Sequence, residues 1–236
     1  TISAAEVRAC APKGIILSGG PASVYAPGAP KCDAEILRLG VPVLGICYGM
    51  QLGTLLLGGQ VQAAPAREYG RTTLTVKDPG KLFDGLPGEL TVWNSHGDQV
   101  DRVSADFAPL ASTPTCPFAA VKHKQSDFYG VQFHPEVSHT PHGSEILGNF
   151  LREVCGCSGD WRMGAFIAET VERIRAQVGK DHVVCGLSGG VDSSVVAMLV
   201  HQAVGERLHS IFVDNGVLRL NEVESVSRMF RGHFHV

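Results

Sequence analysis

The chain has 236 residues and a net charge of −3, with 44% hydrophobic and 18% charged residues. This composition is typical of a globular protein with a buried core, and the charge provides no general attraction to nucleic acid or to an anionic membrane. No apolar run reaches the roughly 18 residues that a membrane-spanning helix needs. The cysteines are seven in number and scattered, which argues against a disulfide framework and predicts a reducing, cytoplasmic environment.

The order of apolar segments predicts an α/β protein. Short β-branched runs alternate with longer amphipathic segments, as in a parallel sheet covered by helices. Some strands are separated only by turn-rich segments, so we expect part of the first sheet to be antiparallel. The predicted strands are 14–17, 41–46, 71–76, 89–93, 119–122, 129–133, 182–187 and 208–213. The predicted helices are 48–57, 143–154, 163–178, 193–204 and 221–230, and the first residues (SAAEVRACAPKG) are also helix-like.

A small and polar segment, 155–161 (CGCSGDW), divides the chain. Cys155 and Cys157 lack matching Cys or His ligands nearby, so we interpret them as linker residues rather than as a zinc site. The segment therefore separates two predicted domains, 1–155 and 156–236.

The first candidate for chemistry is Cys47. It lies in GICYG (45–49), between a predicted buried strand and a predicted helix. This is the pattern of a nucleophile elbow, in which flanking glycines relieve crowding at a sharp turn. Such a turn exposes the thiol near helix amides, which favour the thiolate. A single cysteine is equally well a small buried hydrophobic residue, so only the presence of a partner side chain can identify Cys47 as a nucleophile.

His134 supplies that partner. It directly follows the strand 129–133, at the sheet edge where α/β proteins assemble their sites. Glu136, two residues later, can accept a hydrogen bond from the imidazole and fix its orientation. A Cys–His pair with an acidic residue is the general form of an activated thiol nucleophile. We therefore predict that Cys47, His134 and Glu136 act together.

Three motifs now carry a family resemblance: LSGGP at 17–21, GICYGMQ at 45–51 and VQFHPEV at 131–137. They resemble the signatures of the class I glutamine amidotransferases, whose domain is flavodoxin-like. The resemblance implies that Cys47 attacks the side-chain amide of glutamine and releases ammonia, leaving a γ-glutamyl thioester. His134 would move the protons, and Glu136 would hold His134. The resemblance also implies an oxyanion hole at Gly20 and Tyr48, and glutamine-binding residues Gln51, Ser95 and His96.

One residue departs from the family pattern. Before SHGD (95–98) we expect an apolar residue, typically methionine, and this chain has Asn94. We expect this change to alter the affinity for glutamine and to leave the chemistry intact.

A glycine turn opens the second domain, between the strand 182–187 and the helix 193–204. Clustered N–H donors in such a loop suit a polyphosphate, although the lysine of the Walker pattern is missing. SGGVDSS resembles the loop of the N-type ATP pyrophosphatases, which have a Rossmann-like, adenine-nucleotide alpha-hydrolase-like fold. The resemblance implies ATP contacts from Ser188, Gly189, Gly190, Val191, Asp192, Ser193, Ser194 and Val213, with Asp192 orienting Mg²⁺.

The order of the two domains resembles the GMP synthetase family, and local matches such as SGGPASVY, SHGD and FVDNG extend across almost the whole chain. The resemblance implies a glutamine-hydrolysing ligase. ATP would adenylate the C2 oxygen of xanthosine 5′-monophosphate, and ammonia would displace AMP to give GMP and diphosphate. No tightly bound cofactor, nucleic acid or membrane would be involved.

Both ends of the chain look cut. It begins at Thr1 without an initiator methionine and ends at Val236 within HFHV, which has the composition of a new strand. Set against the family, the first strand of the amidotransferase domain is absent, as is the C-terminal part, through which the parent would form a homodimer. We therefore expect a fragment that does not make GMP by itself.

Two alternatives remain open. The chain could be a non-catalytic regulatory or assembly fragment, or its glutaminase could serve another ATP-dependent amination. NAD synthetases and thiouridylases share the SGGxDS loop, but not the combination of Cys47 with His134 and Glu136. CTP and carbamoyl phosphate synthetases share the triad but lack the loop.

Overall fold

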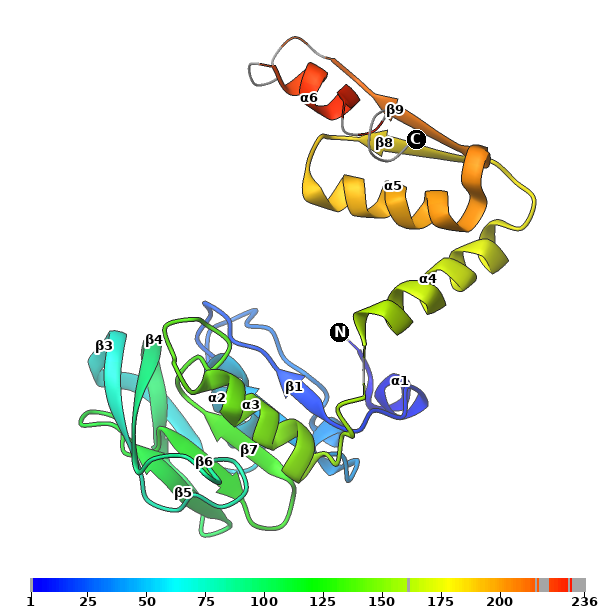
Figure 1. Cartoon of the computed structure of the whole chain (residues 1–236). Helices are drawn as coiled ribbons and strands as arrows, with labels where there is room; N and C mark the ends of the chain where they lie inside the picture. Colours follow the sequence, from blue (N-terminus) through cyan, green and yellow to red (C-terminus); the bar gives the residue numbers. More distant parts are fainter. Residues whose placement is uncertain (1, 161, 215, 217–220, 229, 231–236) are drawn as a thin grey trace. The chain divides into compact units, whose positions relative to one another are not determined.

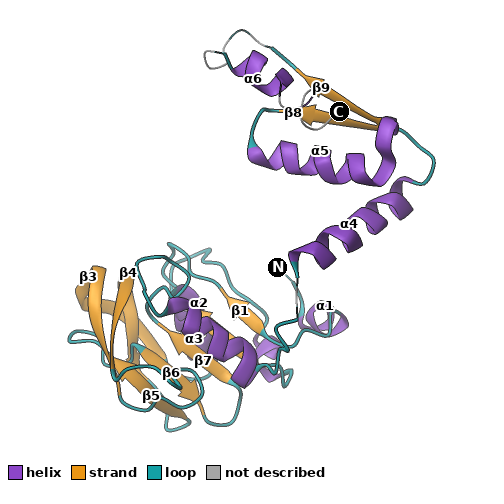
Figure 2. Cartoon of the chain, viewed as in Figure 1, coloured by secondary structure: helices purple, strands orange, loops and turns teal. Residues whose placement is uncertain are grey.

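The computed structural model describes residues 2–160, 162–214, 216, 221–228 and 230. The chain divides into two compact units, Thr1–Gly159 and Asp160–Val236. The division lies inside the segment 155–161, where the sequence predicts a linker. The first unit is built round one large sheet and the second round a short pair of strands (Figures 1 and 2).

The α/β architecture that the sequence predicts is confirmed in the first unit. Its elements are α1 (Ala4–Ala9), β1 (Ile15–Leu17), the 3₁₀ turn η1 (Ala34–Arg38), β2 (Val43–Ile46), α2 (Tyr48–Leu56), β3 (Gln60–Val76), β4 (Glu89–Arg102), β5 (Phe107–Ser112), β6 (Ala120–His123), β7 (Phe128–Val131), α3 (Gly143–Asn149) and the π-helical turn η2 (Phe150–Val154). The strands form a seven-stranded sheet in the order β1-β2-β7-β6-β5-β3-β4.

The parallel part of this sheet consists of β1, β2 and β7. The residues of β2 and β7 are buried along the whole of each strand. A parallel strand that is covered on both faces needs apolar side chains on both faces, which explains the continuous runs VLGI and FYGV. The carboxyl ends of the three strands consequently meet at one edge of the sheet.

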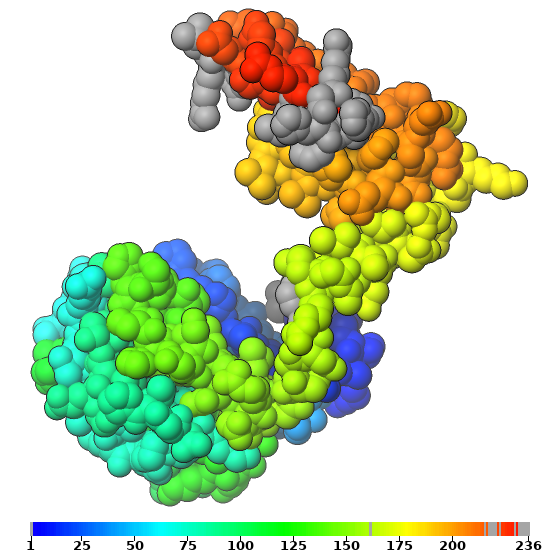
Figure 3. Space-filling model, viewed as in Figure 1, coloured from blue at the N-terminus to red at the C-terminus, as the bar shows by residue number. Residues whose placement is uncertain are grey.

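Helices cover the two faces of the parallel strands. Because neighbouring residues of a strand point to opposite faces, Val43 and Leu44 belong to different clusters of the core. Met50 of α2 packs in the cluster of Val43, whereas Ile146 of α3 and Phe150 pack in the cluster of Leu44. The resulting three layers bury β2 at the centre. Figure 3 shows the side chains of this unit closely packed on the face that is drawn.

The antiparallel part contains β6, β5, β3 and β4, which confirms the expected mixed sheet. Here the structure corrects the predicted boundaries. β3 begins at Gln60 rather than at residue 71, β4 continues to Arg102 rather than ending at 93, and β5 was not predicted. Pro65 and Gly70 are typical of turns, so the sequence pattern does not reveal the first part of β3. The pairing register of β3 with β4 also shifts between Ala63 and Glu68. Pairing with β4 overrides these local turn signals.

The second unit confirms the predicted βαβα run. Its elements are α4 (Met163–Val178), β8 (Val183–Leu187), α5 (Val191–Val204), the 3₁₀ turn η3 (Gly205–Arg207), β9 (Leu208–Phe212) and α6 (Glu222–Arg228). β8 and β9 pair in parallel, and Ala197 of α5 packs with Val171 of α4 and Leu208 of β9 in one core cluster. The predicted strand in HFHV lies outside the described residues. Among the described helices, none combines the length and apolar composition that crossing a bilayer requires.

The contact of α2 with the parallel strands depends on two glycines. A Cβ atom on Gly49 would lie 2.0 Å from the backbone oxygen of Leu17, and one on Gly45 would lie 2.6 Å from the backbone of Gly49. No side chain fits at these distances. The absence of a Cβ therefore allows the first turn of α2 to lie directly on β1 and β2.

We predict that Gly49→Ala destabilises the first unit by about 2 kcal/mol, because overpacking against a backbone carbonyl outweighs the better helix propensity of alanine. Urea unfolding followed by circular dichroism measures the change. Gly88→Ala is the matched control, since nothing lies within 4 Å of a Cβ at that position. Equal stabilities of the two variants would contradict the argument.

Candidate functional site

Cys47 lies at the turn between β2 and α2, as the elbow pattern predicts. Its backbone has a φ of 49° and a ψ of −105°, a conformation that non-glycine residues rarely adopt. Its N–H donates to the backbone oxygen of Val131 at 2.8 Å, and the residue is 5% exposed. The strained turn thus fixes the thiol at the carboxyl edge of the sheet.

His134 is held at the same edge by its backbone and its ring. Its N–H donates to the backbone oxygen of Trp93 at 2.9 Å, and its own carbonyl accepts from the hydroxyl of Thr140 at 2.6 Å. The Nδ1 atom lies 2.7 Å from a carboxylate oxygen of Glu136. Glu136 therefore fixes the ring and leaves Nε2 as the atom that can face a reacting group.

Gly19 links the histidine to the cysteine. A Cβ on Gly19 would lie 3.0 Å from Cε1 of His134 and 3.7 Å from Cβ of Cys47, so both side chains border the same small space. Among the described residues, the buried Nε2 of His134 has no partner in hydrogen-bonding geometry. Hydrogen bonds between catalytic groups are often long in a free enzyme and tighten when the substrate arrives.

The electrostatics of this edge favour a protonated histidine. Interaction with Cys47 is the main cause that raises the pKa of His134 to about 9, Glu136 adds to it, and burial opposes it. This interaction between His134 and Cys47 lacks the geometry of a full hydrogen bond, because Nε2 of His134 has no partner in that geometry among the described residues. At neutral pH the ring consequently carries a proton that it can donate.

Gln132 is a neighbour of the thiol to which sequence reasoning assigned no role. It is fully buried, and its Nε2 lies 3.7 Å from Sγ of Cys47 as a donor. A polar residue between the apolar Val131 and Phe133 at a strand end was the available signal. Its amide adds a second polar contact to the sulfur.

The predicted oxyanion residues lie next to each other. Tyr48 is the first residue of α2, and the N–H groups of a first helical turn have no acceptor within their own helix. A Cβ on Gly20 would lie 3.6 Å from Cγ of Tyr48. Gly20 and Cys47 also border one cavity, of about 510 Å³.

That cavity is polar and opens beside Cys47. Gln51, Ser95 and His96, which the sequence predicts to bind glutamine, all line it. The structure adds Arg67 and Asp98 to its wall. Asp98 was visible in the sequence as the end of SHGD, whereas Arg67 lies in a stretch that was not predicted to be a strand.

The predicted glutamine-binding residues differ in whether their polar atoms are already hydrogen-bonded within the protein. Ser95 is exposed, and no described hydrogen bond uses its hydroxyl. His96 is 4% exposed, and its ring nitrogens face the backbone oxygen of Asp98 at 3.0 Å and the carboxylate of Glu68 at 3.1 Å. Nε2 of Gln51 donates to the backbone oxygen of Asp98 at 2.8 Å. His96 is thus occupied within the protein.

Asn94, the departure from the family pattern, is buried and does not line the cavity. It is 1% exposed, and its Nδ2 donates to the carboxylate of Glu68 at 2.7 Å. Its Oδ1 has no partner among the described residues. Its connection to glutamine is therefore indirect, through Glu68.

The glycine turn of the second unit lies between β8 and α5. Gly189 has a φ of 77°, and Gly190 caps α5. The Ser193 hydroxyl lies 3.0 Å from that of Ser188, and the Ser194 hydroxyl donates to the Gly190 oxygen at 2.8 Å. The first amides of α5 have no acceptor within the helix, whereas the amides of Ser188 and Gly190 donate to serine hydroxyls of the loop. The side chains of Asp192 and Val213, for which the resemblance implies contacts with Mg²⁺ and ATP respectively, are exposed.

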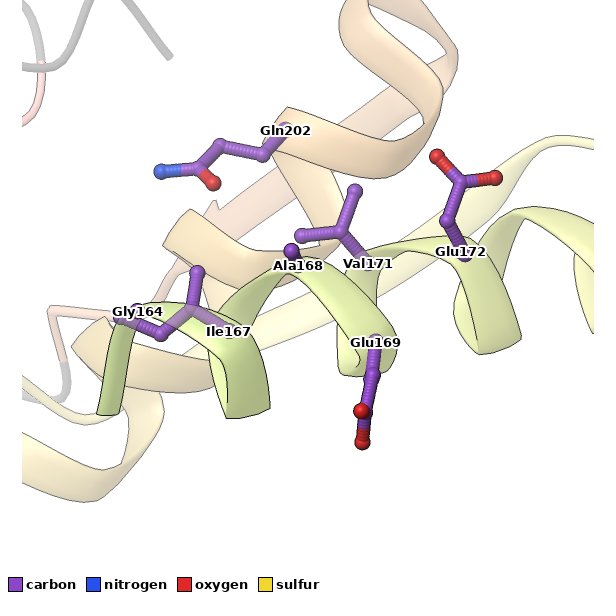
Figure 4. A pocket seen from close by; sticks show the side chains of 7 residues that line it. All are labelled: Gly164, Ile167, Ala168, Glu169, Val171, Glu172 and Gln202. Atoms are coloured by element: carbon purple, nitrogen blue, oxygen red, sulfur yellow. The ribbon is translucent and has the colours of Figure 1, made fainter. Parts of the chain in front are cut away.

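A second hollow lies on α4 and α5 (Figure 4). It has a volume of about 640 Å³ and is lined by Gly164, Ile167, Ala168, Glu169, Val171, Glu172 and Gln202. The carboxylate of Glu169 points away from the other labelled side chains. This hollow contains neither a nucleophile nor a histidine, and it carries no chemistry that we can assign.

Comparison with known proteins follows the division into two units. The family model for class-I glutamine amidotransferases matches residues 1–154. The chain belongs to the class-I glutamine amidotransferase family. A model for NAD synthase matches residues 162–226, beyond the amidotransferase part.

Relatives of this amidotransferase match both units at once. GMP synthase (glutamine-hydrolysing) of Caldanaerobacter subterraneus is 54% identical over 233 residues, which are 99% of this chain and 46% of the relative. The enzyme of the same description from Geobacillus kaustophilus is 55% identical over 236 residues, or 100% of this chain and 46% of the relative. The chain therefore spans about half the length of the curated relatives it matches.

A solved structure supports the fold of the amidotransferase unit. A Thermoplasma acidophilum protein, provisionally described as one subunit of GMP synthase, superposes with a TM-score of 0.57 at 34% sequence identity. The match covers 66% of this chain and 77% of the other protein.

We predict that the ring of His134 titrates near pH 9 rather than near its ordinary 6.5. Cys47→Ala should lower this pKa most, and Glu136→Gln should lower it less, following the order of the causes. Because the folded protein favours the protonated ring, the associated stability is present below pH 6.5 and is lost as the pH rises through about 9. NMR titration of the ring carbons measures the three values, and an unchanged pKa in Cys47→Ala would contradict the prediction.

Proposed function

We propose that the first unit hydrolyses glutamine, with Cys47 as nucleophile, His134 as acid and base, and Glu136 as the residue that orients His134. The observation that carries this proposal is their arrangement at the carboxyl ends of β2 and β7. Gly19 borders both the cysteine and the histidine side chains, and Glu136 lies 2.7 Å from the histidine ring. Membership in the class-I amidotransferase family supports the same assignment.

The chemistry follows from the protonation of His134. Cys47 first transfers its thiol proton to His134. Its Sγ then attacks the amide carbon of the substrate, and the carbonyl oxygen becomes an oxyanion facing the N–H groups of Gly20 and Tyr48. The C–N bond breaks as His134 donates its proton to the departing nitrogen, which leaves as ammonia. A γ-glutamyl thioester remains on the sulfur. Water then attacks the thioester, with His134 accepting the proton, and glutamate leaves.

The polar cavity beside Cys47 suits the amino-acid end of glutamine. Its volume of about 510 Å³ is that of a small-molecule site, and its wall contains the opposite charges of Arg67 and Asp98. The Ser95 hydroxyl has no hydrogen bond among the described residues, and Gln51 borders both the cavity and the buried Gln132. His96 also lines this wall, but both of its ring nitrogens are already engaged within the protein.

We further propose that the glycine turn of the second unit, residues 188–194, binds the phosphates of ATP. Its support is the group of N–H donors at the start of α5. Mg²⁺ bound with nucleotides takes one or two carboxylates together with phosphate oxygens, and the exposed Asp192 in the first turn of α5 meets that requirement. When bound, the ion would neutralise phosphate charge, while Val213 borders the adenosine.

For the protein that contains this chain, we propose the synthesis of GMP from xanthosine 5′-monophosphate, ATP and glutamine. The relatives that match both units over nearly the whole chain carry the name GMP synthase, and this supports the choice of acceptor. The adenylated C2 oxygen would leave as AMP when ammonia attacks. Holding ammonia inside the protein preserves its nucleophilicity, because free ammonia is largely protonated at neutral pH.

The glutaminase proposal predicts that glutamine forms a thioester on Cys47. The chain is incubated with glutamine, quenched in acid and analysed by peptide mass spectrometry, and released ammonia is measured in parallel. Cys47→Ala should abolish both signals, whereas Cys10→Ala, which removes an exposed cysteine of the same unit, should leave them intact. Ammonia release that persists in Cys47→Ala would overturn the assignment.

The acceptor is tested separately, in the gene product that contains this chain. Cleavage of ATP to AMP and diphosphate should require xanthosine 5′-monophosphate, and inosine 5′-monophosphate, which lacks the C2 oxygen, should not support it. In that protein, Cys47→Ala should lose synthesis from glutamine and keep synthesis from ammonium salts. Loss of both activities would indicate a structural role for the cysteine.

A further inference from the structure

A buried acidic residue lies behind the cavity wall. Glu68 is 7% exposed, and it pairs with His96 across β3 and β4, at the end of the register shift in β3. A carboxylate in such a place costs several kcal/mol of desolvation unless partners compensate it. The glutamine chemistry described above does not use it.

Four side chains compensate Glu68. Oε2 accepts from Nδ2 of Asn94 at 2.7 Å and faces Nε2 of His96 at 3.1 Å. Oε1 accepts from the hydroxyls of Thr113, at 2.5 Å, and Thr115. Burial alone would raise the pKa of Glu68, but the hydrogen bonds from His96, Thr113 and Thr115 together hold it below its ordinary value. Glu68 is consequently an ionised carboxylate inside the unit.

His96 connects the ionised Glu68 to the cavity wall. Its Nδ1 lies 3.0 Å from the backbone oxygen of Asp98, while its Nε2 faces Glu68. Both neighbours are acceptors, so the ring is fixed from both sides. The side chain of Asp98 is also held, by the hydroxyls of Ser23 at 2.5 Å and Tyr25 at 2.6 Å. Asp98 is therefore immobilised through its backbone and its carboxylate.

The same backbone oxygen connects the wall to the nucleophile. It accepts from Nε2 of Gln51 at 2.8 Å, and that nitrogen lies 3.3 Å from Oε1 of Gln132. Nε2 of Gln132 in turn faces the sulfur of Cys47 at 3.7 Å. An unbroken series of polar contacts thus runs from Glu68 to the thiol.

We propose that Glu68 is a positioning residue for glutamine: through His96 it fixes Asp98 and Gln51, and so sets the shape of the cavity wall beside Cys47. This inference rests on the proposed glutaminase function. It concerns recognition of the amino acid and not the reactivity of the sulfur, because Glu68 touches neither Cys47 nor the cavity. Removing its charge should weaken binding and spare the thiol.

The experiment separates recognition from reactivity on the full chain. Cys47 is alkylated either by a chloroketone analogue of glutamine, which must occupy the cavity, or by iodoacetamide, which need not. Mass spectrometry of the peptide that contains Cys47 gives the rate of each reaction. For the analogue, the concentration dependence yields both the half-saturating concentration and the maximal rate.

Glu68→Gln should raise the half-saturating concentration of the analogue about tenfold or more, by analogy with the loss of affinity when a hydrogen-bond partner of a metal-ligating side chain is removed. Its maximal rate and the iodoacetamide rate should stay within about twofold of the parent chain. Glu89→Gln, at an exposed position at the start of β4, is the matched control and should change neither quantity. Thr115→Val removes one of the donors to Glu68 and should give a smaller loss in the same direction.

The outcomes are distinguishable. If Glu68→Gln folds, as judged by circular dichroism, and binds the analogue as the control does, the inference is wrong. It is equally wrong if both alkylation rates fall together, because that indicates general distortion. Should Glu68→Gln not fold, an unchanged half-saturating concentration in Thr115→Val overturns the inference. If the analogue fails to label Cys47 in the parent chain, or glutamine fails to protect it, the proposed glutaminase function fails instead.

Discussion

The backbone contact between α2 and the parallel strands determines where everything else in the first unit can lie. Gly49 touches the carbonyl of Leu17, and Gly45 touches Gly49, with no room for a methyl group at either place. The helix therefore begins immediately after Cys47, whose own N–H donates to Val131 at the end of β7, and His134 follows three residues later. Cys47, the first amides of α2 and His134 converge because three strands end together and one helix starts among them.

Charge in the first unit is arranged in two layers around this point. Near the sulfur, the raised pKa of His134 keeps a proton on the imidazole beside Cys47. Farther away, Glu68 is ionised but fully engaged, so it has no proton to exchange and no freedom to move. The proposed role of His134 needs a group that changes its protonation state, whereas the proposed role of Glu68 needs a group that does not. Burial with partners, rather than distance from solvent alone, separates these two behaviours.

The sequence could predict what is encoded locally. The runs at 14–17 and 41–46, and the glycines round Cys47, carry their structure in adjacent residues, and the motifs follow directly from strand ends. The long arms of β3 and β4 could not be predicted, because Pro65 and Gly70 imitate a turn and only pairing with a distant strand overrules them. The role of Glu68 could not be predicted from the sequence either. Its partners come from two segments distant from it in the sequence, β4 and the residues that follow β5, so its role becomes visible only in three dimensions. The roles of Cys47, His134 and Glu136 in catalysis stay predictions that the geometry favours.

The backbone of Cys47 has a consequence for how this protein evolves. A φ of 49° costs a residue with a side chain about 1–3 kcal/mol, which glycine would largely avoid. Replacement of Cys47 by glycine would therefore relax the turn while deleting the sulfur. Selection for folding stability alone would therefore favour glycine at position 47, and the resulting protein would lack the thiol. Where the cysteine persists across generations, selection for activity must be opposing the gain in stability, so its persistence records that the thiol is in use.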